Sequence, residues 1–351
     1  MRFMYRLITS TPDEALWPSL VRALLPSRSL SARRYMLVVS SGPPHSAHIL
    51  AVLLGRKLRC PVVLEFRDPW ARAPWGPKPT NPWGSHLARH LEPLVTSQAR
   101  ALVAVTNRHR DQLRRVYRHL RHVEITAFPN GYDGSPDRFV SRSEAAALRK
   151  KWFPTLPSGR VLCTHAGSLY RKRDPRYLIR GLVHLTARER EKICFVHVGP
   201  VVAKHRAVLE RAAKDLGCLQ VIEPVSPDEV HEIYAASDAF WILQPGTAIQ
   251  VPSKLYEVIP YGRPLLFVGS EGEASEIVRQ YGLGLAANPA NPHHVAAAIR
   301  TLLANKAHAI DPNGWRRAIN DFNGRVIADK YARFLCELGG MSAVFLVTRT
   351  A

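Results

Sequence analysis

The amino-acid sequence of 351 residues lacks the features that mark membrane-spanning, secreted and metal-scaffold proteins. No apolar run approaches about 20 residues, so no transmembrane helix is predicted. The opening residues Met-Arg-Phe-Met-Tyr-Arg-Leu-Ile do not form the apolar region of a signal peptide. The five cysteines make no CxxC pair and no His/Cys ligand cluster, which favours a reduced, cytoplasmic protein. Any membrane association is therefore expected to be peripheral, at the inner face.

Common nucleotide and hydrolase signatures are missing as well. No GxGxxG follows a predicted strand and no GxxxxGK[ST] occurs, which argues against a dinucleotide-dependent dehydrogenase and a P-loop enzyme. No GxSxG elbow is present. There is also no DxD pair, which would normally hold a divalent cation on a sugar-nucleotide diphosphate. We therefore expect neither a metal nor a cofactor.

What the sequence has in excess is positive charge, with a net +21 at neutral pH. Residues 1–150 carry 24 Lys and Arg against 10 Asp and Glu, and the remainder carries 25 against 18. A basic first half suits an anionic partner, either nucleic acid or, as we favour, an anionic membrane with phospholipid-linked substrates. The alternative is a general excess of arginine without function. The densest cluster is Arg108, Arg110, Arg114, Arg115, Arg118 and Arg121.

Short β-branched runs alternate with longer amphipathic runs, which is the pattern of βαβ units in a parallel sheet. Turn-rich segments at 129–136 and 153–159 divide this pattern. The predicted fold class is α/β, with two Rossmann-like parallel-sheet domains that face a cleft. We expect an incomplete first domain at 1–135, a second domain at 136–315, a helix at 316–338 that crosses back to the first domain, and a tail at 339–351.

The individual elements follow from the same periodicity. Strands are predicted at 35–40, 62–66, 102–106, 123–128, 161–166, 193–198, 219–223, 239–243 and 265–268. Helices are predicted at 47–58, 84–98, 108–117, 175–185, 203–216, 227–235, 253–259, 274–281, 293–303 and 315–338. The first 34 residues are expected to form one helix and loops, without a founding strand and Gly-rich turn. The first domain is for that reason expected to be incomplete.

The segment from Gln250 to Gly269 carries an informative pair of charges. Lys254 and Glu257 lie three residues apart in a predicted helix that follows a strand, so they share one face of that helix. Open α/β sheets bind nucleotides at the carboxyl ends of their strands. There the lysine can meet a diphosphate and the glutamate can accept hydrogen bonds from ribose hydroxyls. The alternative is a solvated ion pair on a surface helix.

A second candidate segment follows the first strand of the second half. Gly167 and Ser168 free the backbone to approach a ligand, and Arg171, Lys172 and Arg173 add cations just before the next helix. Backbone N–H groups at a helix N-terminus together with cations make a phosphate site. A basic loop that is only solvated is the alternative.

Two residues of the first half are candidates for contact with a substrate. Asp68 comes directly after a predicted strand and before a proline, so it faces the loop at the carboxyl end of that strand. His45 lies in the strand-to-helix turn at 40–46. The alternatives are an Asp68–Arg67 pair that braces the loop and a histidine that is merely on the surface.

Taken together, these segments resemble the GT-B glycosyltransferases, in particular the family 4-like enzymes of bacterial polysaccharide synthesis. The matching pieces occur in the family's order over roughly residues 10–338. They are Ser41-Gly-Pro-Pro-His-Ser46, Glu65-Phe-Arg-Asp-Pro-Trp70, Phe128-Pro-Asn-Gly-Tyr-Asp133, His165-Ala-Gly-Ser168 with Arg173-Asp-Pro175, and Pro252-Ser-Lys-Leu-Tyr-Glu257 with Gly262-Arg-Pro264.

The resemblance implies a UDP- or GDP-sugar donor, bound mainly by the second domain, and a glycan or lipid-linked acceptor. Lys254 and Arg173 would neutralise the diphosphate in place of a metal and so stabilise the leaving group. Glu257 would bind the donor ribose, and Gly167 would admit the phosphates. The family usually retains the anomeric configuration, because the donor's own phosphate helps to deprotonate the acceptor.

The acceptor would lie over the first domain near Asp68 and His45, with Asp68 as a hypothetical base. Two features depart from the family pattern: Ile249 stands where relatives often have a first glutamate, and the opening 34 residues show no founding strand, as if the start were misassigned or the protein truncated. Two other functions stay open. One is a sugar-nucleotide 2-epimerase, which shares this architecture and would use Asp68, His45 and His165. The other is a truncated, non-catalytic binder of anionic partners.

Overall fold

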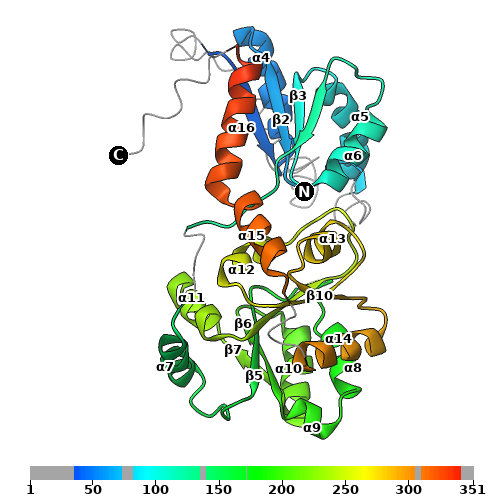
Figure 1. Ribbon diagram of the computed structural model, residues 1–351. Coiled ribbons are helices and arrows are strands. Elements are labelled where there is room, and N and C mark those ends of the chain that lie inside the picture. Colours follow the sequence, from blue (N-terminus) through cyan, green and yellow to red (C-terminus); the bar gives the residue numbers. More distant parts are fainter. Residues whose placement is uncertain (1–34, 73–81, 135–139, 171, 305–309, 341–351) are drawn as a thin grey trace. The chain divides into compact units, whose positions relative to one another are not determined.

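The computed structural model describes residues 35–72, 82–134, 140–170, 172–304 and 310–340 (Figure 1). The expectations for residues 1–34, for Arg171 and for the end of the tail lie outside these ranges. The described chain divides into two compact units. One holds the residues up to Pro129 and from Ile327 onward, and the other holds Asn130–Val326. The expected limit at 135/136 lies six residues after the first division, and the expected limit at 315/316 lies eleven residues before the second.

The first unit is built on a parallel sheet in which each strand pairs with the next strand along the chain. The carboxyl ends of its strands therefore lie along the same edge. The strands are β1 (Val38–Gly42), β2 (Val62–Phe66), β3 (Ala101–Ala104) and β4 (Glu124–Ala127), in that order across the sheet. The crossover helices are α4 (Ala47–Leu58), α5 (Pro82–Thr96) and α6 (Asn107–Val116).

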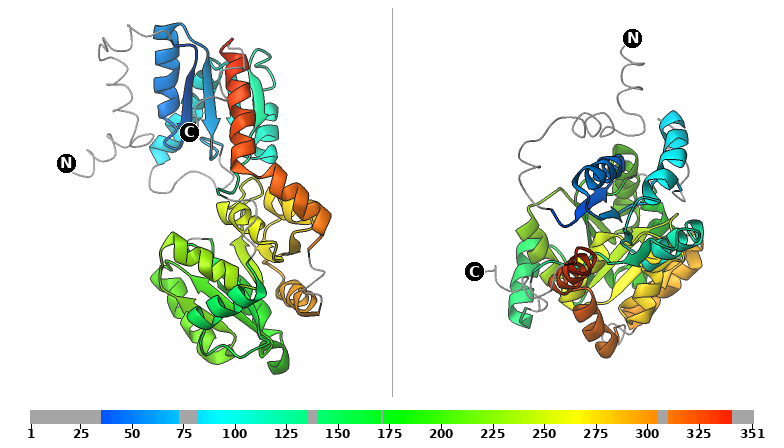
Figure 2. Two further views of the ribbon diagram at one scale, coloured as in Figure 1. Left: turned by 60° about the vertical axis from the view of Figure 1, so that its left-hand side comes forward. Right: turned by 90° about the horizontal axis from the view of Figure 1, so that it is seen from above.

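Both faces of the two central strands, β2 and β3, are buried, which explains why these strands are almost continuously apolar, whereas the edge strands β1 and β4 are partly polar. One face packs beneath α4, α5 and α6, with Leu64, Phe66 and Leu102 at its centre. The other face packs against α16 (Gly324–Leu338), which lies alongside the sheet in Figure 1 and in the left view of Figure 2 (red in both). The contacts on that face join Val63, Ala101 and Val103 of the sheet to Tyr331, Phe334, Leu335 and Leu338 of the helix.

The second unit contains a parallel sheet of six strands in the order β10-β9-β8-β5-β6-β7. These strands are β5 (Val161–Ala166), β6 (Ile193–Val198), β7 (Leu219–Ile222), β8 (Ala239–Gln244), β9 (Leu265–Gly269) and β10 (Gly284–Ala287). The helices are α7 (Arg142–Trp152), α8 (Arg176–Val183), α9 (Ala187–Arg190), α10 (Ala203–Leu216), α11 (Pro227–Ala236), α12 (Ser253–Val258), α13 (Glu273–Gln280), α14 (Pro292–Ala304) and α15 (Pro312–Asp321).

The order of these strands reverses between β5 and β8. From β5 the chain builds outward through β6 and β7, and then returns to place β8 on the other side of β5. From β8 it builds outward again through β9 and β10. In open α/β sheets, the carboxyl ends of the two strands at such a switch point are the usual place for a ligand.

The predicted class of two parallel-sheet α/β domains is confirmed, and each predicted strand has a counterpart. Three short or exposed elements, β10, α7 and α9, are not predicted from the sequence. Strand β10 has the sequence Gly-Leu-Ala-Ala, without a β-branched residue, and pairs only with β9. Helix α7 has no fully buried residue and meets the core through partly buried side chains such as Leu148 and Trp152, so its apolar stripe is weak, and α9 is only four residues long.

The single helix predicted at 315–338 is wrong, because the chain breaks at Phe322 and Asn323. The Asn323 side-chain oxygen accepts hydrogen bonds from the backbone N–H groups of Arg325 and Val326 and so caps α16. Tyr132, which is distant in the sequence, stabilises the break with two backbone hydrogen bonds. Its N–H donates to the Phe322 carbonyl (2.9 Å), and its carbonyl accepts from the Gly324 N–H (3.0 Å). A side chain at position 324 would come within 2.8 Å of that Tyr132 carbonyl.

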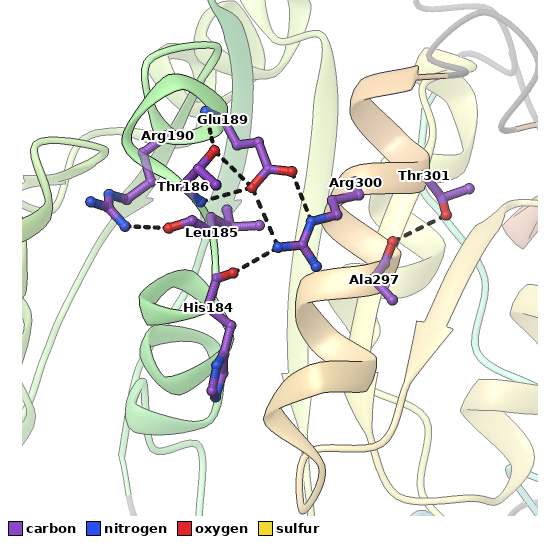
Figure 3. A network of polar contacts seen from close by, with 8 residues as sticks. All are labelled: His184, Leu185, Thr186, Glu189, Arg190, Ala297, Arg300 and Thr301. Carbon is purple, nitrogen blue, oxygen red and sulfur yellow. Dashed lines mark hydrogen bonds and ion pairs between the residues drawn. The ribbon is translucent and has the colours of Figure 1, made fainter.

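A polar network ties α9 to α14 (Figure 3). The Arg300 guanidinium on α14 donates to the Glu189 carboxylate (Nε–Oε1 2.7 Å) and to the carbonyl of His184 (2.7 Å). Glu189 also accepts from the backbone N–H of Thr186, whose hydroxyl caps α9. The hydrogen bonds from Arg300 and Thr186 lower the pKa of Glu189 to about 2, so this carboxylate stays charged at all ordinary pH values.

Several histidines are buried in the two cores and held neutral. Burial, with the neighbouring His45, lowers the pKa of His48 to about 3. Burial also lowers the pKa of His109 and His197 to about 4 each. An unfolded chain binds protons on these rings below about pH 6.5, whereas the folded chain does not. Their contribution to stability is therefore complete at neutral pH and is lost as the pH falls.

We predict that the free energy of unfolding decreases between about pH 6.5 and about pH 4.5, with a slope of up to about 1.4 kcal/mol per pH unit for each buried histidine. Urea titrations across this range measure the slope. His109→Asn reduces the slope, whereas the same change at the exposed His119 leaves it unaltered. A stability that stays constant down to pH 4.5 would contradict the neutral, buried assignment.

Candidate functional site

Two glycines shape the carboxyl ends of β5 and β6. Gly167 has φ +148°, and its N–H donates to the Val198 carbonyl (2.9 Å), which extends the pairing of the two strands. Gly199 has φ +124°, and a side chain there would come within 2.6 Å of the Gly167 carbonyl oxygen. Only glycine allows both the positive φ and this close approach. The backbone after β5 is thereby bare, and Ser168 follows it half-buried.

Arg173 is presented at the start of α8 by a loop with its own hydrogen bonds. Its backbone N–H donates to the Tyr170 carbonyl (3.0 Å), and its guanidinium lies 5.5 Å from the centre of the Tyr170 ring. The next residue, Asp174, accepts from the N–H of Arg176 (3.0 Å) and so binds a free N–H group of the helix. The cation is thus held at the N-terminus of a helix that begins beside the switch point.

Lys254 and Glu257 occupy α12, which follows β8. Their side chains form an ion pair (Nζ–Oε2 2.5 Å), and the lysine and glutamate are 30% and 36% exposed. The ion pair considered as the alternative from the sequence therefore exists. Its position is the informative feature: a Cβ placed on Gly167 would lie 3.6 Å from Lys254 Cε. The glycine after β5 and the lysine after β8 meet at the switch point.

Further loop contacts surround this junction. A side chain at Gly246, in the loop after β8, would come within 2.9 Å of the aliphatic stem of Lys172, from the loop after β5. The Gly246 N–H donates to the hydroxyl of Ser270, which follows β9 (2.7 Å). The structure thus brings Gly167, Arg173 and Lys254 to the edge formed by β5, β8 and β9. The contact between Lys172 and Gly246 and the hydrogen bond between Gly246 and Ser270 could not be predicted from the sequence, because the three loops are far apart along the chain.

In the first unit the structure brings together the segments that carry His45 and Asp68. Arg67, beside Asp68, donates its backbone N–H to the Gly42 carbonyl and its side chain to the Pro43 carbonyl (2.6 Å). The His45 ring stacks on Trp70 with centroids 5.6 Å apart. His45 is only 9% exposed, so it is not a surface histidine, whereas Asp68 is half-buried.

The buried Glu92 anchors the Asp68-bearing loop from below. Its carboxylate accepts from the N–H of Ala71 (2.7 Å) and from the hydroxyl of Tyr117 (2.8 Å). Burial raises the pKa of Glu92. In the described ranges, no group of three or more His, Cys, Asp or Glu side chains is placed to hold a metal ion. None of the described helices combines the length and apolar character that a bilayer crossing requires.

Comparison with known proteins identifies the class of this arrangement. The family model described as "Glycosyl transferase 4-like domain" matches residues 5–131, and the model described as "Glycosyl transferases group 1" matches residues 160–305. The chain belongs to the 4-like, group 1 glycosyltransferases. The class of reaction is therefore sugar transfer from a nucleotide donor.

Solved glycosyltransferase structures share the fold of this enzyme. Anabaena HepE in complex with UDP is 17% identical, with a TM-score of 0.66 over 86% of this chain and 79% of that chain. Sucrose-phosphate synthase from Thermosynechococcus elongatus is 18% identical, with a TM-score of 0.64 over 88% and 75%. A trehalose-phosphate synthase from Burkholderia multivorans is 15% identical, with a TM-score of 0.63 over 97% and 84%. None of the curated proteins compared with the glycosyltransferase matches it.

Proposed function

We propose that this glycosyltransferase binds a UDP-sugar at the β5–β8 switch point and transfers the sugar to a glycan or lipid-linked acceptor without a metal ion. The observation that supports this most strongly is the meeting of Gly167, Arg173 and Lys254 at that point. A diphosphate over Gly167 would have bare backbone beneath it and two cations beside it. UDP is favoured over GDP because HepE, of the same fold, has been solved with UDP and with UDP-glucose.

The ion pair between Lys254 and Glu257 is compatible with this role. Both side chains are about one-third exposed, and a pair of that kind contributes on the order of 1 kcal/mol or less. A diphosphate carries more negative charge than one carboxylate, so it competes effectively for the lysine. Glu257 is then released to accept hydrogen bonds from the ribose hydroxyls.

The chemical step that fits these residues retains the anomeric configuration. The bond between the sugar C1 and the diphosphate oxygen breaks, and the acceptor oxygen bonds to C1 on the same face. The acceptor proton passes to an oxygen of the departing diphosphate. Lys254 and Arg173 stabilise the negative charge that develops on this leaving group. No protein base is needed at C1 in this scheme.

On the acceptor side we assign Asp68 to orient the acceptor hydroxyl by accepting its hydrogen bond. Its loop is fixed by Glu92 and by the Arg67 contacts with the β1–α4 turn. His45 lies in that turn and stacks on Trp70, so its role is to position the Asp68 loop.

The five cysteines, all free, suit the cytoplasm, where nucleotide sugars are available.

Lys254→Ala and Glu257→Ala are each expected to reduce by at least half the rise in melting temperature that millimolar UDP produces in the wild type. The lysine variant loses a diphosphate contact and the glutamate variant loses a ribose contact. Differential scanning fluorimetry with UDP, GDP and no nucleotide measures the shift. Equal shifts in the wild type and in both variants would rule out the assigned site.

The chain offers a matched control in the same unit. Lys151 and Glu232 form another ion pair of 2.5 Å on the surface, so Lys151→Ala and Glu232→Ala remove equivalent charges and should leave the UDP shift unchanged. Asp68→Asn separates the two substrates: it should keep the UDP shift while transfer to the acceptor is lost. Transfer at the wild-type rate in Asp68→Asn would refute its acceptor role.

We also propose that the basic α6 region, which comprises α6 and the turn after it as far as Arg121, binds an anionic membrane surface that carries the acceptor. Arg115, Arg118 and Arg121 are exposed there, whereas Arg114 is engaged by the Ile125 carbonyl. Lipid headgroups attract such a cluster with about 1 kcal/mol per residue close to the surface. If the charge reflects only a general excess of arginine, no binding to lipid headgroups is expected at this cluster.

Reversal of these three arginines to glutamate is expected to abolish sedimentation with vesicles that contain phosphatidylserine. Reversal of three exposed cations of the second unit, Arg188, Lys192 and Lys214, should have a much smaller effect. Vesicles of phosphatidylcholine alone should bind neither protein, and added salt should weaken the binding. Equal binding by both reversal variants would show that the α6 region has no special part.

A further inference from the structure

The missing side chain of Gly167 leaves a small space that we name the Gly167 notch. A Cβ built there would lie 3.5 Å from His165 Nε2 and 3.6 Å from Lys254 Cε, which are ordinary contact distances. A ligand atom in the notch would therefore touch both the imidazole nitrogen and the stem of the lysine. The proposed diphosphate site includes this notch, yet the mechanism above gives His165 no part in it.

His165 is buried and its orientation is fixed by the sheet. It lies on β5 opposite His197 of β6, with ring centroids 5.4 Å apart, and it is 3% exposed. Its Nδ1 lies 3.0 Å from the Trp241 carbonyl oxygen on β8. A carbonyl can only accept, so Nδ1 carries the hydrogen and the lone pair of the neutral ring is on Nε2.

The Nε2 atom is the one polar atom of this ring without a partner. It is fully buried and makes no hydrogen bond, although it borders the Gly167 notch. Buried polar atoms are almost always hydrogen-bonded, so an exception at a proposed binding site calls for an explanation. A bare lone pair would repel a phosphate oxygen in the notch, whereas a protonated Nε2 would donate to it.

Resting on the proposed donor site, we infer that His165 binds the diphosphate: Nε2 takes up a proton as the nucleotide sugar binds and donates it in a hydrogen bond to a diphosphate oxygen. His165 is thus a further residue of the donor site. Donor affinity is for the same reason linked to pH. The proton comes from solvent and returns to it when the nucleotide leaves.

The charges around the ring explain why the proton is absent before binding and present after it. The titratable and charged groups that face His165 are His197 on β6, Arg173 in the loop after β5, and Lys254 on α12. Burial, with these neighbours, lowers the pKa of His165 well below its usual value near 6.5. His197 is itself held neutral, with a pKa of about 4. The repulsion from full charges therefore comes from Arg173 and Lys254.

A bound diphosphate reverses this balance. Its two negative charges offset the two cations and lie next to Nε2, so they raise the pKa of His165 in the complex. When a group has a higher pKa in the complex than in the free protein, the affinity increases as the pH falls between the two values. A single proton allows a change of at most about tenfold in affinity per pH unit.

Isothermal titration calorimetry with UDP-glucose tests this inference in the intact chain. UDP-glucose is suitable because both of its phosphates are esterified and exchange no proton near neutral pH, unlike the terminal phosphate of UDP. Titration at about pH 6.5 in two buffers of different ionisation enthalpy measures the number of protons taken up. For the wild type we expect net uptake of a fraction of one proton per site, and tighter binding at about pH 6 than at about pH 7.5.

Two substitutions separate the parts played by the two ring nitrogens. In His165→Asn the side-chain amide can keep the donor to the Trp241 carbonyl, but Nε2 is lost, so we expect weaker binding and no proton uptake. In His165→Gln the amide reaches the position of Nε2 and provides a permanent donor, so binding should recover in part while uptake stays absent. His197→Asn, which changes the neighbouring ring away from the notch, should retain the uptake.

The outcomes distinguish this inference from the function on which it rests. Binding of UDP-glucose by the wild type without proton uptake, or with uptake that persists in His165→Asn, would overturn the role of His165 and leave the donor site standing. Loss of affinity in His165→Asn without uptake in the wild type would point to a sugar or ribose hydroxyl that donates to Nε2, and would equally overturn the protonation. Failure of the wild type to bind both UDP-glucose and UDP would overturn the donor site and this inference with it.

Discussion

The pairing of β5 with β8 is the contact on which the proposed site depends. The two strands share a short parallel register, Cys163 with Ala239 and Thr164 with Phe240. Asp238 secures its start: its N–H donates to the Leu162 carbonyl, and its carboxylate accepts from the Leu162 N–H and from Arg149. This short contact joins the two halves of the six-stranded sheet. The loops after β5 and after β8 can supply one ligand together only because the two strands are neighbours.

The junction between β5 and β8 combines an open backbone with two positive charges. Positive φ angles at Gly167 and Gly199 keep side chains away from the strand ends, so the space over the backbone stays open. The structure places Arg173 and Lys254 in the same region, and Lys254 forms an ion pair with Glu257. Arg173 and Lys254 lie beside the buried, neutral His165, and the negative charge of a bound diphosphate would offset the positive charge of these two residues.

The fold could be predicted where burial leaves a local pattern. The strands Val62–Phe66 and Ala101–Ala104 are covered on both faces, and apart from Glu65 they are apolar throughout. Strand β10 and helix α7 have no such pattern, and the break at Asn323 depends on Tyr132, which is distant in the sequence. The same limit holds at the site. The order of Gly167, Arg173 and Lys254 could be read from the sequence, but the hydrogen on His165 Nδ1 is set by the Trp241 carbonyl, across a strand pairing that only the fold reveals.

A crystal structure of the chain with UDP would test the central claim most directly. We expect the diphosphate over Gly167, with its oxygens about 3 Å from Lys254 Nζ and near the Arg173 guanidinium, and the ribose hydroxyls on Glu257. The Lys254–Glu257 ion pair should be opened in that complex. UDP bound elsewhere, with this ion pair intact and the Gly167 notch empty, would contradict the account.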